Sequence, residues 1–218
     1  MELKGIDISG DTLRKVFQKW TNKNVFEIAY NIIIDIYKDR KIDFTDLFID
    51  ASNIKNYMGS ELTGVNHCDK FKLATKLSII TDDLGVPVSI HLEKCNVHDI
   101  KLVVPNLEKI KIDTESAENL IADKGYISKT LKQYISEKYK MRIITPEKNP
   151  KKGVKKKSSE NDKIKLRKRY IVEHTFSWIK NYTRLFRRKD KKISMYVSFM
   201  FFGICNITAN KMEKYIIK

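Results

Sequence analysis

Three acidic residues, far apart in the sequence, have the surroundings that metal-assisted chemistry on a phosphodiester requires. Asp50 follows the apolar residues of FTDLFI, and Asp123 follows those of ENLIA, so each comes at the end of an apolar segment. Glu173 lies within RYIVEHTFSWIK, beside an apolar stripe and between cations. A carboxylate at the edge of an apolar region is costly unless it is paired or binds a metal ion.

Each of these residues also has an ordinary interpretation. An Asp at the end of a strand commonly caps a turn, and Arg169 and Glu173 have the spacing of a helical ion pair worth only a few tenths of a kcal/mol. If the strands of Asp50 and Asp123 are neighbours, and the helix of Glu173 crosses the same edge, the three carboxylates meet. Such a set suits two Mg²⁺ or Mn²⁺ ions about 3.5–4 Å apart, which clamp the attacking and leaving oxygens of a phosphodiester. Zinc is not predicted because no His or Cys joins the set.

The segment 159–188 is predicted to form one long helix that carries Glu173. Ser159 begins it as a capping residue, and neither Gly nor Pro interrupts it. On a helical wheel Arg169, Glu173 and Lys180 fall within about 40° of one another. The carboxylate is therefore flanked by cations along one line of the helix.

The net charge of +16 is concentrated around this segment. Residues 138–192 contain 21 Lys and Arg against 5 Asp and Glu, and the remainder of the chain is neutral. A basic segment without function is possible, but such a concentration inside the chain favours a polyanionic partner, most commonly nucleic acid.

The remaining pattern predicts a mixed α/β sheet with helices on its faces. Residues 147–163 are rich in Lys, Pro, Gly and Ser and are predicted to form a loop. The predicted helices lie within 11–38, from 96 to about 107 with Asp99 as a cap residue, and at 128–139. The predicted strands lie at 43–55, as a hairpin over 71–94, at 120–122 and at 141–146.

Cysteine usage and hydropathy favour a reduced intracellular compartment. The three cysteines are odd in number and lack zinc spacing, so ordinary thiols are expected. The apolar run 195–207 is too short to cross a bilayer and predicts a buried core helix.

With these motifs in order, the chain resembles the DDE-type transposases of bacterial insertion sequences, in the insertion-sequence four/five superfamily. The resemblance rests on FIDAS with Asp50, IADKGY with Asp123, and RYIVEHTFSWIKNYTRLFRR with Glu173. Arg169, Glu173 and Lys180 have the spacing of the family's Tyr-Arg-Glu-Lys signature. The chain departs from that signature at its first position, where Leu166 replaces Tyr.

The resemblance implies a ribonuclease H-like α/β fold over residues 43–218, in which an antiparallel meander is followed by parallel strands. Residues 1–42 would form an N-terminal helical segment, as part of a DNA-binding region. Asp50 would bridge two Mg²⁺ or Mn²⁺ ions, Asp123 would bind one and Glu173 the other. Cations implied to contact DNA phosphates are Arg169, Lys180, Arg184, Arg187, Arg188, Lys155, Lys156 and Lys157.

The implied activity is metal-dependent cleavage at transposon ends, followed by transfer of the freed 3′-OH into target DNA. The expected partners are double-stranded DNA, as transposon ends and target, and a second copy of the chain within the DNA complex. No membrane role is expected, and the expected location is the cytoplasm, with the nucleoid. Two alternatives stay open at this point: a decayed or domesticated transposase that only binds DNA, and a ribonuclease H-type nuclease that does not join strands.

Overall fold

The computed structural model describes residues 8–41, 43–110, 112, 116–147 and 159–216. A seven-stranded sheet at its centre has the order β2-β3-β1-β5-β6, with β4 also paired to β3 and β7 to β1. Its strands are β1 (Asp46–Asn56), β2 (Gly64–Asn66), β3 (Lys72–Thr81), β4 (Pro87–Lys94), β5 (Asn119–Ile121), β6 (Arg142–Ile144) and β7 (Arg187–Arg188).

The sheet combines the two kinds of pairing that the sequence predicted. β1, β3 and β4 are successive antiparallel neighbours, whereas β5 is parallel to β1 and β6 is parallel to β5. β1 therefore lies between the meander and the parallel strands. Its residues Leu47, Phe48 and Ile49 are completely buried, as expected for a central strand covered on both faces.

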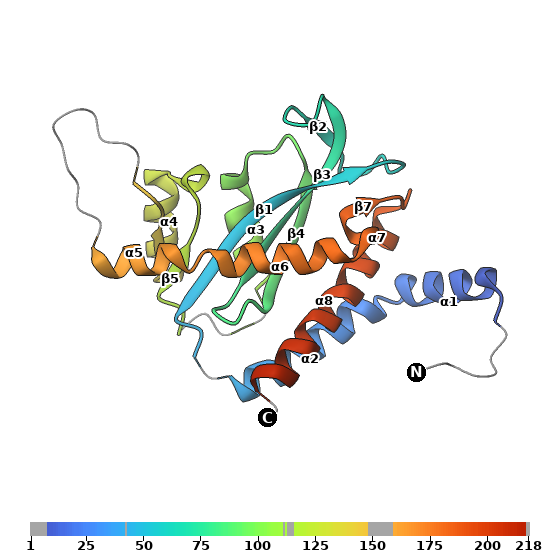
Figure 1. Cartoon of the computed structure of the whole chain (residues 1–218), viewed down its shortest axis with the longest axis horizontal. Helices are drawn as coiled ribbons and strands as arrows, with labels where there is room; N and C mark the ends of the chain where they lie inside the picture. The colour runs from blue at the N-terminus through green and yellow to red at the C-terminus, as the bar shows by residue number, and fades with distance from the viewer. Residues whose placement is uncertain (1–7, 42, 111, 113–115, 148–158, 217–218) are drawn as a thin grey trace.

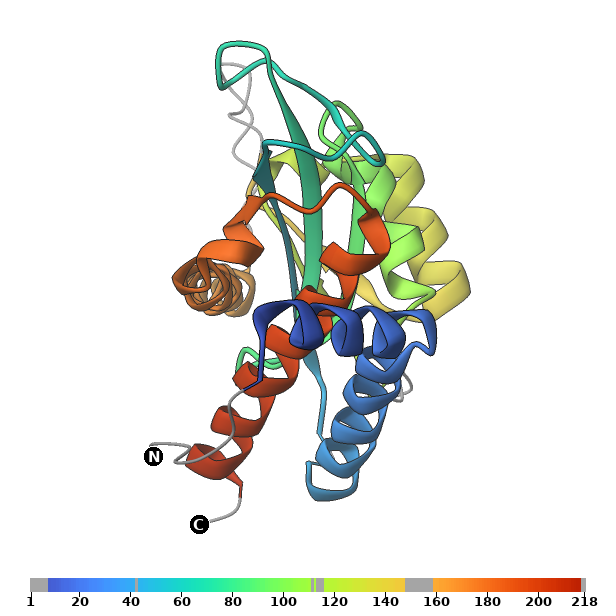
Figure 2. The same cartoon turned by 90° about the vertical axis from the view of Figure 1, so that its right-hand side faces the viewer.

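Helices cover the two faces of this sheet (Figures 1 and 2). Figure 2 shows the α5–α6 segment end-on at one face, with α3 and α4 on the other. The helices are α1 (Gly10–Asn22), α2 (Val25–Arg40), α3 (Val103–Leu107), α4 (Lys129–Tyr139), α5 (Glu160–Arg167), α6 (Tyr170–Asn181), α7 (Thr183–Phe186) and α8 (Ile193–Tyr215). Two 3₁₀ turns, η1 (Asp99–Leu102) and η2 (Lys124–Tyr126), connect the sheet to α3 and α4.

Serine side chains start three of these helices. Ser9, Ser128 and Ser159 each accept a hydrogen bond from the backbone N–H three residues later, which satisfies one of the unpaired donors of the first turn. The predicted starts at Ser128 and Ser159 are thus confirmed. The predicted loop 147–163 extends too far, because α5 already begins at Glu160; its residues 148–158 lie outside the described part of the chain.

The single long helix predicted over 159–188 is wrong. The segment forms α5, α6 and α7 and then the short strand β7. Backbone at Tyr182 is extended, with φ −87° and ψ 96°, which turns the chain back toward the sheet. β7 then pairs with the end of β1. No local signal encodes this break, since it follows from pairing with a distant strand and from burying Arg188.

The C-terminal helix α8 is a core helix, as predicted, but it is longer than the apolar run 195–207. By length and composition α8 could span a bilayer. Its buried residues Tyr196, Met200, Ile204 and Ile207 join the same hydrophobic core as the sheet. Packing against α2 and the other helices around it therefore accounts for its apolar composition.

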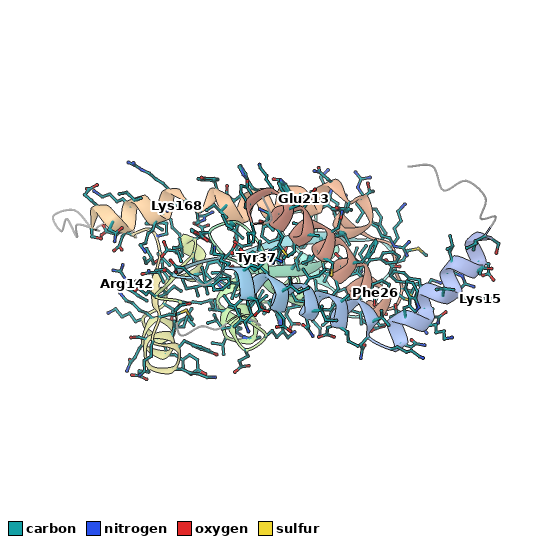
Figure 3. The ribbon with its side chains drawn as sticks, turned by 90° about the horizontal axis from the view of Figure 1, so that it is seen from below. Lys15, Phe26, Tyr37, Arg142, Lys168 and Glu213 are labelled. Atoms are coloured by element: carbon teal, nitrogen blue, oxygen red, sulfur yellow. The ribbon has the colours of Figure 1, made fainter. Side chains whose placement is uncertain are left out.

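The N-terminal helices extend from this core. α2 contributes Tyr30, Ile34 and Tyr37 to it, and Phe17 of α1 stacks on Phe199 of α8 with ring centroids 4.0 Å apart. Figure 3 shows Lys15 of α1 at the end of the molecule opposite to Lys168. The basic face of α1 is therefore remote from α5, and its binding of DNA stays a prediction.

Candidate active site

The sheet register brings Asp50 and Asp123 to the same level. Phe48 pairs with Ile121 in the parallel β1–β5 ladder, and the same offset continued for two residues pairs Asp50 with Asp123. β5 ends at Ile121, whereas β1 continues past Asp50 to Asn56. Asp50 therefore lies inside its strand. The expectation from the sequence that Asp50 ends the strand was wrong. Its flank is open because the neighbouring strand stops two residues short.

The surroundings of Asp50 oppose its ionisation. Burial raises the pKa of this carboxyl, and the nearby carboxylates of Asp123 and Glu173 act in the same direction. The Ala51 N–H, 2.8 Å from Oδ1, and the positive charge of Arg169 lower the pKa but do not outweigh burial. A carboxylate held in this way is stabilised by any further cation that enters the site.

The guanidinium of Arg169 joins the other two carboxylates. Its Nη1 donates to Asp123 Oδ1 and its Nη2 to Glu173 Oε1, both at 2.8 Å. About half of each carboxylate is exposed, while the Arg169 side chain is only 20% exposed. Its Nε is buried and has no hydrogen-bond partner in the described part of the chain. The contact with Arg169 holds the Glu173 carboxylate in one orientation.

The three carboxylates fit a magnesium site in chemical kind, since all their donor atoms are oxygens of the type that Mg²⁺ and Mn²⁺ prefer. They do not converge as ligands here: among the described residues, no three His, Cys, Asp or Glu side chains lie close enough to hold one ion. The reason is visible in the contacts, because the Arg169 guanidinium lies between Asp123 and Glu173. Binding an ion between these two carboxylates requires Arg169 to release one of them.

Buried and half-buried contacts hold the α5–α6 segment against the sheet. Lys165 donates to Asp46 at 2.5 Å, and both side chains are less than 15% exposed. Asp46 also accepts from Asn119 of β5 at 2.9 Å. Further along, Thr175 of α6 donates to the backbone oxygen of Gly85 at 2.8 Å. The position of Glu173 is therefore set by contacts on both sides of it.

Lys165→Met is expected to destabilise the protein by about 1–3 kcal/mol, because it leaves the half-buried Asp46 carboxylate without its cation. Looser attachment of α5 should also lower any activity that depends on Glu173. Urea unfolding measures the first effect. Lys163→Met is the matched control, since Lys163 forms an exposed pair with Glu160 and should change stability by less than about 0.5 kcal/mol. Equal effects of the two substitutions would contradict this role.

The sequence pattern assigned no role to two residues beside the site. Lys76 lies within β3, is 9% exposed, and donates to Asp99 and to the backbone oxygen of Val97, both at 2.6 Å. Tyr126 is buried, and its hydroxyl has no partner within the residues that the structure describes. Burial raises the pKa of Tyr126, and the carboxylates of Asp50, Asp99 and Asp123 add to that effect.

Asp99 was predicted as a helix cap, but His98 has that role: its Nδ1 accepts from the Ile100 N–H at 3.4 Å. Asp99 instead holds Lys76. One signal for this ion pair was present in the sequence: Lys76 lies inside the apolar run KLATKLSII. A buried cation needs an anionic partner.

The predicted DNA-contacting cations occupy different environments. Lys180 and Arg187 are exposed and available. Arg184 binds Asp190 at 2.6 Å and lies 3.7 Å from the centroid of the Phe199 ring, so it is partly engaged within the protein. Arg188 is completely buried, and the prediction that it contacts DNA is wrong for this arrangement. Residues 155–157 lie outside the described part of the chain.

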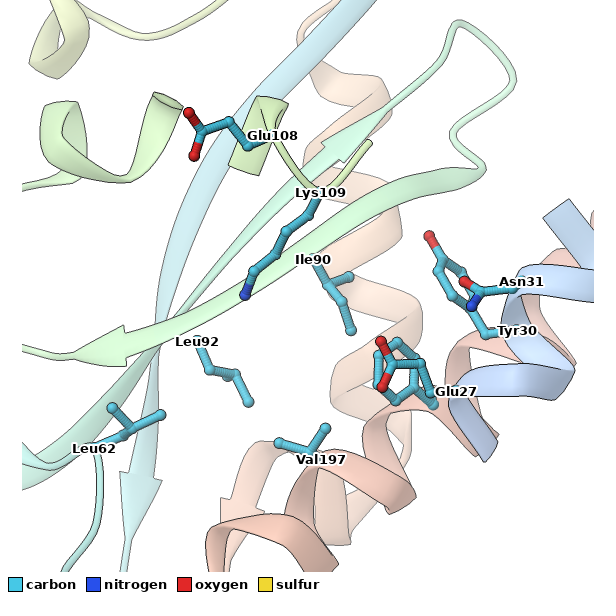
Figure 4. A pocket seen from close by; sticks show the side chains of 10 residues that line it. Glu27, Tyr30, Asn31, Leu62, Ile90, Leu92, Glu108, Lys109 and Val197 are labelled. Carbon is cyan, nitrogen blue, oxygen red and sulfur yellow. The ribbon is translucent and has the colours of Figure 1, made fainter. Parts of the chain in front are cut away.

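A cavity of ≈ 370 Å³ between α2, β4, α8 and the end of α3 does not coincide with this site (Figure 4). Tyr30, Leu92 and Lys109 are among the residues that line it, and none of the three carboxylates does. The carboxylates lie instead on an open surface where α6 crosses β1. An open surface suits a long polymeric substrate better than a small molecule, which is normally enclosed.

Comparisons with known proteins show the family to which this chain is similar. A family model described as the transposase DDE domain matches residues 43–205, which include all three carboxylates. The protein assigned as the transposase of insertion sequence element IS402 from Burkholderia cepacia is 24% identical over 163 residues, 72% of either chain.

A solved structure gives an independent comparison of the fold. Over 79% of its length, the chain superposes on piggyBac transposase in a synaptic complex with hairpin DNA, with a TM-score of 0.53 and 10% identity. It spans 48% of that piggyBac chain, and at this identity the likeness concerns the fold alone. It confirms the predicted mixed sheet with helices on both faces. Because the family model matches residues 43–205, the chain belongs to the transposase DDE domain family.

Proposed function

We propose that this protein is a DNA transposase that cuts DNA at transposon ends and joins the freed 3′-OH to target DNA. The observation that carries the proposal is that the Arg169 guanidinium binds Asp123 and Glu173 beside Asp50, where α6 crosses β1. Carboxylates from β1, from α6 and from the segment after β5 would supply the oxygen ligands, and those of Asp123 and Glu173 are about half exposed to solvent.

Two bound divalent ions would activate water for cleavage and the 3′-OH for joining, and they would stabilise the charge on the phosphate. Asp50, Asp123 and Glu173 would hold these ions. Arg169 would then be free to bind a phosphate oxygen that carries negative charge. Lys180 and Arg187, both exposed, would hold the DNA backbone, which positions a strand but reads no sequence.

The partners follow from this reaction. Because two transposon ends must be brought to one target, we propose that at least two copies of the chain act in the DNA complex. The protein would work in the compartment that contains the DNA, the cytoplasm with its nucleoid.

Strand transfer from a pre-cut end with a free 3′-OH, in the presence of Mg²⁺, tests the proposal. The wild type should join this end to a target duplex, and Asp123→Asn should not. Binding of DNA without cleavage by the wild type would indicate a DNA-binding protein. Hydrolysis without joining would indicate a nuclease. Either result would overturn the proposed strand transfer.

Arg169→Gln is expected to make the protein more dependent on divalent ions. The substitution removes the positive charge that binds Asp123 and Glu173, and leaves three carboxylates facing one another. Without divalent ions the melting temperature should fall below that of the wild type, and millimolar Ca²⁺ should raise it more than it raises the wild type. Differential scanning fluorimetry measures both values. Lys180→Gln should change neither the melting temperature without divalent ions nor its rise with Ca²⁺. An equal rise with Ca²⁺ in Arg169→Gln and the wild type would refute the idea that Arg169 and a divalent ion compete for the same carboxylates.

A further inference from the structure

The far end of β1 carries a hollow that the catalytic site does not use. It has a volume of ≈ 420 Å³ and lies between the end of β1 and the β2–β3 hairpin, at the upper right in Figure 1. Its wall includes an aromatic ring, an aliphatic side chain and charged groups, from Tyr57, Leu73, Lys55, Lys72 and Asp69. Tyr57 is 58% exposed and Leu73 is 49% exposed. The hollow therefore presents apolar surface to solvent between cations.

The turn beside this hollow has an unusual backbone. Lys72 N–H bonds to Asp69 O at 3.0 Å, and the two central residues, Lys70 and Phe71, have φ values of 50° and 57°. Two positive φ angles are typical of a type I′ hairpin turn, which strongly favours Asn-Gly. Lys and Phe are unfavourable there, and the turn leaves Phe71 69% exposed. The Phe71 ring lies edge-on to the ring of His67, with centroids 5.3 Å apart, and leaves most of its surface to solvent.

The loop on the other side of the hollow is held in place. The Tyr57 N–H donates to Arg188 O at 2.9 Å, and the buried Arg188 guanidinium donates to Glu61 O at 2.6 Å. Asn56 accepts from the Gly59 N–H at 3.0 Å, which closes the turn between them. The Tyr57 ring is consequently presented on a fixed backbone, so little conformational entropy is lost when something binds against it.

Cations outnumber anions around the hollow. Lys55 and Lys72 each lie 3.9 Å from Asp69, too far for a hydrogen bond, and both are more than half exposed. Lys70 and Arg187 are exposed nearby, and Arg187 is the β7 partner of Lys55. Exposed aromatic rings interleaved with lysines are the features that bind single-stranded nucleic acid, by stacking on bases and neutralising phosphates.

We propose that this hollow binds an unpaired nucleotide of the DNA strand that runs from the catalytic carboxylates, with its base against Tyr57 and Phe71 and its phosphates beside Lys55 and Lys72. The proposal rests on the proposed action on DNA. Lys55 follows Asp50 by five residues on the same strand, which is about 16 Å at the usual rise of a strand. Along B-DNA this corresponds to about five nucleotides. The site would therefore hold a base roughly that far from the cut phosphate.

The test uses the double substitution Lys70→Asn, Phe71→Gly, which gives the turn the residues that its backbone favours. The melting temperature should stay the same or rise. Binding of a fluorescein-labelled oligo(dT) of about 12 nucleotides, followed by anisotropy, should weaken about tenfold. Affinity for a duplex of equal length should change less than about twofold. Tyr57→Ala should reproduce the loss, and Lys72→Gln should lower the salt dependence of oligo(dT) binding by about 0.7 in slope.

Tyr134→Ala is the matched control, because Tyr134 is a partly exposed aromatic residue of α4 that does not line the hollow, and it should leave both affinities unchanged. The proposal would be overturned if the double variant bound oligo(dT) as tightly as the wild type does. It would also be overturned if the double variant lost affinity for the duplex as strongly as for oligo(dT). Asp50→Asn separates this site from the catalytic one: it should still bind oligo(dT) although it cannot cut. Failure of cleavage by the wild type, with oligo(dT) binding intact, would count against the proposed function alone.

Discussion

Asp50→Asn is expected to abolish DNA cleavage while making the metal-free protein more stable. Activity should fall about 10³-fold or more, because the substitution removes the anionic ligand closest to both proposed ions. Stability should rise because burial disfavours the Asp50 anion, and Asp123 and Glu173 repel it. A neutral amide of the same size removes that cost. Cleavage of a labelled duplex with Mg²⁺ and urea unfolding without divalent ions measure the two effects.

The gain in stability should depend on pH. The pKa of Asp50 is raised in the folded state above its usual 3.8, so the folded protein holds this proton more tightly than the unfolded chain does. The residue therefore destabilises the wild type increasingly as pH rises from about 4 through the raised pKa. The difference between Asp50→Asn and the wild type should be small near pH 4 and largest at neutral pH.

Asp11→Asn provides the control of opposite sign. The exposed Asp11 carboxyl has its pKa lowered by Lys15 and Arg14, so its substitution should not stabilise the protein at neutral pH. Two results would refute the assignment of Asp50: retained cleavage in Asp50→Asn, or a stability difference that does not grow with pH.

Arg188→Ala is expected to destabilise the protein by about 3–5 kcal/mol, the largest effect on stability that we predict. The guanidinium is completely buried and donates to Glu61 O at 2.6 Å, to Thr75 Oγ1 at 3.1 Å and to Asp190 O at 3.2 Å. Truncation leaves these acceptors unpaired and opens a cavity. Urea unfolding should show a lower midpoint with an unchanged slope.

Its neighbour Arg187 should behave in the opposite way. Arg187 is exposed, so Arg187→Ala should change stability by less than about 0.5 kcal/mol. If Arg187 contacts a DNA phosphate, the salt dependence of duplex binding should fall by about one in slope. Similar behaviour of the two arginines in both assays would contradict the assignment.

A second substitution tests the same buried contact from the other side. A Cβ on Gly59 would lie 2.5 Å from the guanidinium of Arg188, so Gly59→Ala should also destabilise the protein. An unperturbed Gly59→Ala would show that the loop does not depend on Arg188.

Adjacent residues 187 and 188 illustrate what sequence reasoning cannot separate. Both are arginines within a strongly basic segment, and both were assigned to DNA for that reason. In a strand, successive side chains point to opposite faces, so one of the two is buried once β7 pairs with β1. A strand of two residues has no pattern of its own, and only the partner decides which arginine is inside.

Local sequence signals are enough to predict most elements and the order of the chemical groups along the chain. Serine caps, alternating apolar segments and the hairpin turn are encoded within a few residues, and the carboxylates Asp50, Asp123 and Glu173 could be selected because each follows or flanks an apolar segment. The contacts between these groups, in contrast, depend on how distant elements pack. The β1–β5 register places Asp50 level with Asp123. The crossing of α6 over the sheet allows Arg169 to bridge Asp123 and Glu173. The contact between β3 and η1 allows Lys76 to pair with Asp99. Each depends on long-range packing, whose free energy outweighs the weak local preferences that a sequence pattern records.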